Sequence, residues 1–140
     1  MREMGTREAA LLWAEAWKHG WEALDPEPIM ARYAQRAVHF TEPFREPSHD
    51  AGDVRAYVER VLGEEEDPRV WIGEPIVDGD RAAIPWWASL REEGADVTLA
   101  GTSVMRFDAD GLVVEQWDAW NELGERREPH SRGPFAKRDT

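Results

Sequence analysis

The chain of 140 residues contains no cysteine and no long apolar run. Without cysteine there is no disulfide framework, no thiolate nucleophile and no thiolate metal site. No stretch approaches the length needed to span a bilayer, and residues 1–5 lack the apolar core of a signal peptide. These absences lead us to expect a cytoplasmic chain that is stabilised by its core alone.

Basic residues are also in short supply, because 17 Lys and Arg face 29 Asp and Glu, giving a formal net charge of −12. Such a surface repels phosphate backbones and anionic lipids, so we expect neither nucleic acid nor membranes as partners. Phosphate-binding and dinucleotide-binding glycine loops are absent, and no histidine pair has the spacing of a zinc site. We therefore expect no cofactor and no bound metal.

Tryptophan, by contrast, is abundant, with eight indole rings in the chain. Trp13, Trp17 and Trp21 recur every four residues, which places them on one face of a helix. Trp86 and Trp120 belong to later stretches that alternate like strands. Large rings fill the core in most proteins. A helix and strands that both carry them can also wall an apolar pocket.

Helical patterns occupy the first half of the chain. We expect a first helix at residues 6–24, with Thr6 as its cap, and a short second helix that begins at the Asp25-Pro26 cap. A third helix is expected to begin at Ser48 or Asp50 and to end at Gly63. A strand at residues 38–41 precedes the third helix, and residues 64–68 form an acidic connector.

Four strand-like runs follow, at residues 69–77, 80–90, 97–107 and 112–120. Glycine-containing turns separate them, so an antiparallel sheet is predicted and the fold class is α+β. The pattern indicates a single domain at residues 1–124. The polar, basic segment at residues 125–140 is expected to be a flexible or loosely docked tail.

Three local strings carry a family resemblance: AAIPW at residues 82–86, VMRF at residues 104–107, and Thr41-Glu42-Pro43. Their order and spacing resemble the nuclear transport factor 2-like superfamily, which includes ketosteroid isomerases, SnoaL-like polyketide cyclases, scytalone dehydratase and limonene epoxide hydrolase. The resemblance spans about residues 11–121. It implies a cone-shaped α+β barrel, in which three N-terminal helices pack on a curved mixed or antiparallel sheet around a deep pocket.

The isomerase resemblance also implies which catalytic groups this chain has lost. Glu42 corresponds to the general base before a proline. Trp17 stands where that family has a tyrosine, and Ser103 stands where it has a protonated aspartate. Each missing oxyanion donor typically costs about 3–4 kcal/mol of transition-state stabilisation. Ketosteroid isomerase activity is therefore not expected.

Two carboxylates are the catalytic candidates, Asp118 and Glu42. Alternation along the last strand points Gln116, Asp118 and Trp120 inward. Asp118 is either an acid/base group or one half of a structural ion pair with Arg106 or a helix side chain. Glu42 is either a base at the pocket mouth or a solvated loop acid.

His39 offers a third titratable group near the same strand. The register that points Glu42 inward turns His39 to the opposite face, unless a bulge shifts it. A histidine at this position is either a structural residue or a general base.

The pocket walls are predicted to come from helices and strands together. They comprise Trp17, Tyr33, Tyr57, Trp86, Ser103, Met105 and Trp120. Such a pocket would hold a small hydrophobic molecule. The chain is then a cofactor-independent isomerase, cyclase, dehydratase or hydrolase, and the alternative is a non-catalytic ligand-binding or assembly module.

The outer sheet face is the second aromatic surface. The same register turns Trp71, Trp87 and Trp117 outward. Several rings on one face form a larger apolar patch than a monomer usually exposes. We therefore expect a homodimer through this face.

Overall fold

A computed structural model describes residues 4–136, and in this range the chain forms three helices and a six-stranded mixed sheet. The elements in chain order are α1 (Thr6–Ala23), α2 (Pro26–Met30), β1 (Tyr33–Phe40), α3 (Ala51–Glu64), β2 (Glu65–Ile72), β3 (Ile76–Asp78), β4 (Arg81–Glu92), β5 (Ala95–Phe107) and β6 (Val113–Leu123). The α+β prediction is confirmed. The first three residues of the predicted domain and the last four of the predicted tail lie outside the described range.

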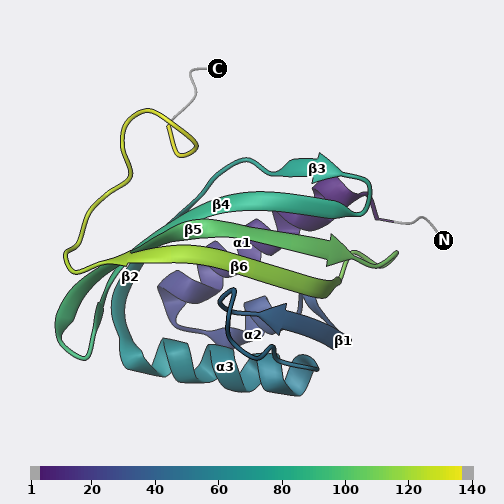
Figure 1. Ribbon diagram of the computed structural model, residues 1–140, viewed down its shortest axis with the longest axis horizontal. Helices are drawn as coiled ribbons and strands as arrows, with labels where there is room; N and C mark the ends of the chain where they lie inside the picture. The colour runs from purple at the N-terminus through teal and green to yellow at the C-terminus, as the bar shows by residue number, and fades with distance from the viewer. Residues whose placement is uncertain (1–3, 137–140) are drawn as a thin grey trace.

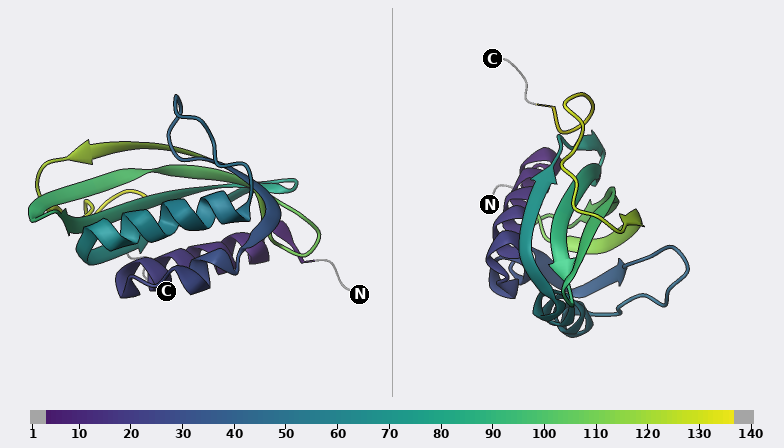
Figure 2. Two further views of the ribbon diagram at one scale, coloured as in Figure 1. Left: turned by 90° about the horizontal axis from the view of Figure 1, so that it is seen from below. Right: turned by 90° about the vertical axis from the view of Figure 1, so that its left-hand side faces the viewer.

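The sheet has the strand order β1-β6-β5-β4-β2, with β3 paired to β4 beyond the end of β2. Only the β1–β6 pair is parallel among the pairings described. The helices gather on one side of this curved sheet, as Figures 1 and 2 show. The sheet and helices together form the cone of the nuclear transport factor 2-like fold.

Helix α1 packs tightly against α2 because a glycine stands where they cross. A Cβ on Gly20 would lie 2.8 Å from both the Asp25 carbonyl oxygen and the Ile29 Cγ1. Asp25 caps α2 by accepting the backbone N–H of Glu27, as the sequence predicts. The predicted cap of α1 was wrong by one residue: Gly5 is the N-cap, and the Thr6 hydroxyl donates to the Gly79 carbonyl instead.

The junction after α3 differs from the prediction. Asp50 caps this helix as expected, but the helix continues through Gly63 to Glu64. The chain then turns directly into extended backbone at Glu65, so β2 replaces the expected acidic connector. Gly63 keeps a negative φ and does not end the helix. The helix ends because β2 begins at Glu65 and pairs with β4.

The predicted strand at residues 69–77 is in fact two strands. It breaks after Ile72, and the Gly73 N–H donates to the Pro85 carbonyl at 2.9 Å. A Cβ on Gly73 would lie 2.7 Å from the Pro85 ring. Both β4 and the tail therefore pack closely against Gly73.

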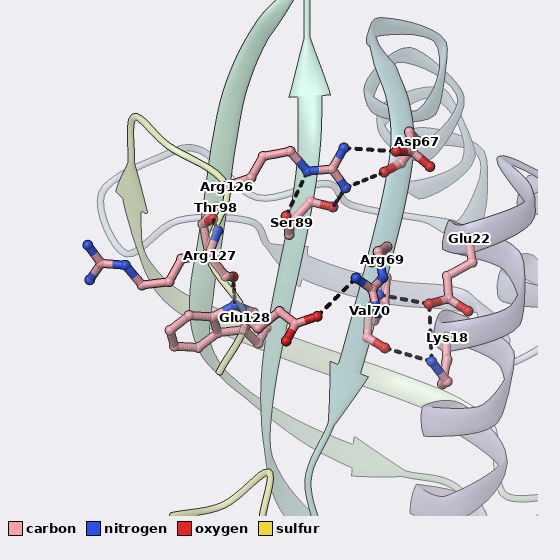
Figure 3. A network of polar contacts seen from close by, with 11 residues as sticks. Lys18, Glu22, Asp67, Arg69, Val70, Ser89, Thr98, Arg126, Arg127 and Glu128 are labelled. Carbon is pink, nitrogen blue, oxygen red and sulfur yellow. Dashed lines mark hydrogen bonds and ion pairs between the residues drawn. The ribbon is translucent and has the colours of Figure 1, made fainter. Parts of the chain in front are cut away.

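The described part of the C-terminal tail lies against the outer face of the sheet. Arg126 forms an ion pair with Asp67 at 2.9 Å, visible in Figure 3. Trp87 donates its indole N–H to the Arg127 carbonyl at 2.7 Å, and the Phe135 ring packs edge-on against the Trp87 ring. The tail therefore covers part of the face on which the outward tryptophans lie.

Two glycines provide a matched test of packing in this fold. A Cβ on Gly101 of β5 would lie 2.6 Å from the Trp120 Cβ and even closer to the Ala119 backbone, whereas a Cβ on Gly63 meets nothing within 4 Å. We expect Gly101→Ala to lower the free energy of unfolding by about 1–3 kcal/mol through overpacking. Gly63→Ala should raise it by about 0.5–1 kcal/mol. Urea denaturation of both variants measures this, and equal effects would contradict the described β5–β6 contact.

Candidate functional site

A cavity of about 220 Å³ lies between the helices and the inner face of the sheet. Six aromatic side chains line it, from α1, α3, β4 and β6: Trp13, Trp17, Trp21, Tyr57, Trp86 and Trp120. The tryptophans thus leave a space rather than filling the cone. This volume is below the roughly 300–1,000 Å³ of typical ligand pockets, so it limits the ligand to a small molecule.

Most of the predicted site residues meet at this cavity. Seven of the nine line it: Trp17, Glu42, Tyr57, Trp86, Ser103, Asp118 and Trp120. The other two, Tyr33 and Met105, are buried in the core and do not belong to the lining. Tyr33 still contributes to the site, because its hydroxyl hydrogen-bonds to Gln116, which lines the cavity.

Asp118 is the centre of a polar cluster in the cavity wall. It is only 8% exposed and accepts three hydrogen bonds. Its Oδ1 accepts from the Ser103 hydroxyl at 2.6 Å and from the Gln116 amide at 3.0 Å. Its Oδ2 lies 2.7 Å from His39 Nε2. The structural partner expected for Asp118, Arg106 or a helix side chain, is replaced by this histidine.

His39 faces the cavity, so the predicted register of β1 was wrong. The buried residues of this strand are Tyr33, Ala37 and His39, and Thr41 continues the series. Pairing with β6 shifts between Tyr33 and Val38, and β1 ends at Phe40, so Glu42 lines the cavity from beyond the strand and does not fix the face of His39. His39 is 1% exposed, and its Nδ1 is buried with no hydrogen-bond partner among the described residues.

A chain of hydrogen bonds fixes the direction of donation toward Asp118. Trp13 and Trp17 can only donate, and both give their indole N–H to the Tyr33 hydroxyl oxygen, at 3.2 and 3.0 Å. Tyr33 must then donate its own proton, which goes to Gln116 Oε1. The Gln116 amide nitrogen is thereby turned toward Asp118. The network therefore fixes Asp118 as an acceptor.

The indole N–H groups of the cavity walls are already hydrogen-bonded to protein groups. Trp86 donates to the Ser103 hydroxyl at 3.0 Å, and Trp120 donates to the Thr41 carbonyl at 2.7 Å. Trp17 donates to Tyr33, as described above. Trp17 and Ser103 stand where the resemblance implied lost oxyanion donors. Both donate their hydrogen bonds to protein groups instead.

Tyr57 is the aromatic wall residue that keeps a free donor. No hydrogen bond to its hydroxyl is found among the described residues, and its ring packs edge-on against His39 with centroids 5.6 Å apart. Burial raises the pKa of Tyr57, and the nearby Asp118 and Glu65 raise it further. The hydroxyl therefore stays protonated at neutral pH and can donate to a ligand beside His39.

Glu42, the second carboxylate candidate, lies at the rim of the cavity. Its side chain is 44% exposed and forms an ion pair with Arg45 at 3.2 Å. This environment is solvated, unlike that of Asp118.

Glu65 is a site residue that the sequence did not reveal. It lines the cavity, is only 6% exposed, and accepts the Trp21 indole N–H at 2.6 Å. Burial raises its pKa to about 7, with further contributions from Glu92 and Glu64. The residue lies in the acidic run at residues 64–67, where composition alone indicated solvent exposure.

Comparison with known proteins identifies the family. Residues 14–116 match the SnoaL-like domain, so the chain belongs to the SnoaL-like family of the nuclear transport factor 2-like superfamily. A search of curated proteins gave no match.

Solved structures share the fold at low sequence identity. RV0760c from Mycobacterium tuberculosis superposes with a TM-score of 0.72 and 17% identity, covering 86% of this chain and 98% of that one. PrhC from Penicillium brasilianum NBRC 6234 has a TM-score of 0.70 and 17% identity, covering 84% and 83%. SalBIII, described as an epoxide hydrolase/cyclase-like enzyme in pyran ring formation in the polyether salinomycin, has a TM-score of 0.70 and 13% identity, covering 81% and 91%.

Two structural features are absent from residues 4–136. No group of three or more histidine or acidic side chains in this range is placed to hold a metal ion. No helix in the same range is both long and apolar enough to cross a membrane.

Proposed function

We propose that this chain is a cofactor-independent acid/base enzyme for a small hydrophobic molecule, with His39 as its general base. The observation that carries the proposal is the buried His39–Asp118 pair, at 2.7 Å, on the wall of an aromatic cavity. Asp118 accepts from Nε2–H, so the neutral imidazole presents its lone pair at Nδ1. That is the nitrogen without a protein partner.

The reaction class that fits these groups is proton abstraction next to a carbonyl. His39 Nδ1 takes the proton from carbon, the C–H electron pair forms a C=C bond, and the carbonyl π pair moves to oxygen. The Tyr57 hydroxyl donates a hydrogen bond to that oxygen as it becomes negative. Return of the proton from the His39 imidazolium to another carbon completes an isomerisation. In a dehydration the enolate re-forms the carbonyl and expels a β-hydroxyl, which takes that proton and leaves as water.

Asp118 acts as a positioning residue in this scheme. A carboxylate that accepts from one ring nitrogen fixes the tautomer and stabilises the imidazolium that forms. The apolar rings around the pair exclude water, which strengthens this interaction. The description of SalBIII as an epoxide hydrolase/cyclase-like enzyme supports acid/base chemistry on this fold, at the level of analogy.

Deuterium exchange tests the proposal without knowledge of the product. A panel of small cyclic and aromatic ketones is incubated with the protein in D₂O, and incorporation next to the carbonyl is followed by NMR. We expect catalysed exchange that falls about 10²–10⁴-fold in His39→Gln and about 10²-fold in Tyr57→Phe.

Glu42→Gln serves as the comparison variant, since Glu42 is the other predicted catalytic carboxylate. Exchange at the wild-type rate in Glu42→Gln, with loss in His39→Gln, supports His39 as the base. Loss in Glu42→Gln with retention in His39→Gln would assign the base to Glu42. No exchange with any ketone would favour the non-catalytic ligand-binding module.

The homodimer through the outer sheet face stays a prediction. Trp117 is 41% exposed on this face, in keeping with an interface. Trp87 is partly covered by the tail, and the Arg69 guanidinium lies over the Trp71 ring at 5.2 Å. A second copy would therefore have to pack on the tail as well as on the sheet.

A further inference from the structure

Carboxylates outnumber cations around the cavity. Glu42 pairs with Arg45 at 3.2 Å, and Glu64 pairs with Arg60 at 3.8 Å, so both arginines that line the cavity are already neutralised. Three further acids line it without an ion-pair partner in the described part of the chain: Glu65, Glu92 and Glu122. Burial, followed by the charges of its acidic neighbours, raises the pKa of Glu92. The cavity thus has an excess of negative charge that the protein does not balance.

Glu65 is the most buried of these three acids. Its side chain is more than nine-tenths buried, and Oε1 accepts the indole N–H of Trp21. Oε2 has no hydrogen-bond partner among residues 4–136. A buried carboxylate needs a proton or a cation to offset its desolvation. The free oxygen belongs to a side chain that lines the ligand cavity, so a ligand can supply that cation.

The walls beside Glu65 also suit a positive charge. The Trp21 ring lies 5.8 Å from the Trp86 ring and 5.8 Å from the Trp17 ring, measured between centroids. All three indole N–H groups donate to the protein, so these side chains offer ring surface to the cavity rather than hydrogen bonds. The negative faces of aromatic rings attract organic cations, and tryptophan does so best.

We infer that the cavity binds an organic cation, a small molecule with an apolar body and one protonated amine, whose ammonium group pairs with Glu65. This inference rests on the proposed function in taking the cavity as the substrate site, and it names the substrate class. The apolar body lies among the tryptophans of the cavity wall, which also includes His39, and the ammonium group lies beside the buried Glu65. The excess of carboxylates also attracts cations to the mouth before they bind.

Four probes that share a phenylethyl group separate charge from hydrophobicity: 2-phenylethylamine, its methyl isostere propylbenzene, the neutral alcohol 2-phenylethanol, and the slightly larger anion 3-phenylpropanoate. Isothermal titration calorimetry with the full chain measures their affinities at pH 8. We expect the amine to bind at least about tenfold more tightly than the alcohol or the hydrocarbon, and the anion to bind most weakly.

Glu65→Gln is the decisive variant, because glutamine keeps the size of the side chain and an acceptor for Trp21. It should weaken amine binding at least about tenfold and leave the alcohol and the hydrocarbon unchanged. Glu66→Gln is the matched control, since Glu66 is the next residue on the same strand and is exposed. The control should bind all four probes like the wild type.

Affinity for the amine should also depend on pH. Burial raises the pKa of Glu65 to about 7, so amine affinity should rise about tenfold from pH 6 to pH 8 as Glu65 ionises. The rise should disappear in Glu65→Gln. The charged and titratable groups lining the cavity around Glu65 come from three elements: Tyr57, Arg60 and Glu64 of α3, Glu92 of β4, and Glu122 of β6.

The inference is overturned if the amine binds no better than the alcohol, if none of the probes binds at millimolar concentration, or if Glu65→Gln keeps the preference for the amine. These binding results are independent of turnover. Amine selectivity without deuterium exchange would retain the ligand class and reject the catalytic proposal, and exchange without selectivity would do the reverse.

Discussion

Asp118→Asn is expected to lower the rate of catalysed proton exchange about 10³–10⁴-fold while leaving the fold intact. The reason is the tautomer of His39. Asp118 now accepts from Nε2, so the lone pair lies at Nδ1, which is buried and has no hydrogen-bond partner among the described residues. An amide that donates to Nε2 instead moves the ring proton to Nδ1 and removes the base.

The hydrogen-bond network decides which way the new amide turns. Gln116 must present its N–H to Oδ1 of residue 118, because its own oxygen accepts from Tyr33 and Trp13. An asparagine therefore places its oxygen toward Gln116 and Ser103, and its nitrogen toward His39. The variant thus locks the histidine in the unproductive tautomer, at almost no cost in volume.

Glu115→Gln is the control for this experiment, because Glu115 lies on the same strand with its side chain 57% exposed on the outer face. It should exchange at the wild-type rate. Asp118→Asn should also bind 2-phenylethylamine as the wild type does, which shows that the cavity has kept its shape. An exchange rate within tenfold of the wild type in Asp118→Asn would contradict a role for the pair.

Glu65→Gln is expected to raise the free energy of unfolding by about 3 kcal/mol at pH 8 and to leave it nearly unchanged at pH 4. Desolvation raises the pKa of Glu65 from 4.5 to about 7, so between these values the folded state binds the proton more tightly than the unfolded state. Stability therefore falls as pH rises through this window. A pKa difference of this size corresponds to about 3 kcal/mol.

Urea denaturation of the wild type and Glu65→Gln across this pH range gives the difference in their free energies of unfolding. The contributions of groups that titrate in both proteins cancel in this difference. Glu66→Gln should show no such pH-dependent difference, because its side chain is exposed in both states. A difference that stays constant from pH 4 to pH 8 would mean that Glu65 is not desolvated in the folded protein.

The meander and the faces of its strands were predictable from alternation. Trp86 lines the cavity and Trp87 contacts the tail, as the two-residue period requires. Gln116, Asp118 and Trp120 face inward for the same reason. In these long strands each inward residue supports the assignment of its neighbours.

The first strand was not predictable in the same way. Its pairing with β6 is irregular between Tyr33 and Val38, and the sequence carries no mark of that shift. A change of one residue exchanges the two faces of a strand, so His39 was assigned outward and missed as the partner of Asp118. Glu65 was missed because the helix before it passes directly into β2, which buries one acid of an acidic run.

The protonation site of His39 is the most direct test of the whole account. Long-range ¹H–¹⁵N NMR distinguishes a protonated from an unprotonated ring nitrogen, and the His39 signals can be assigned by their loss in His39→Gln. At a pH where the ring is neutral, we predict a proton on Nε2 and none on Nδ1, with the reverse in Asp118→Asn. A wild-type ring with its proton on Nδ1 would contradict the assignment of His39 as the base.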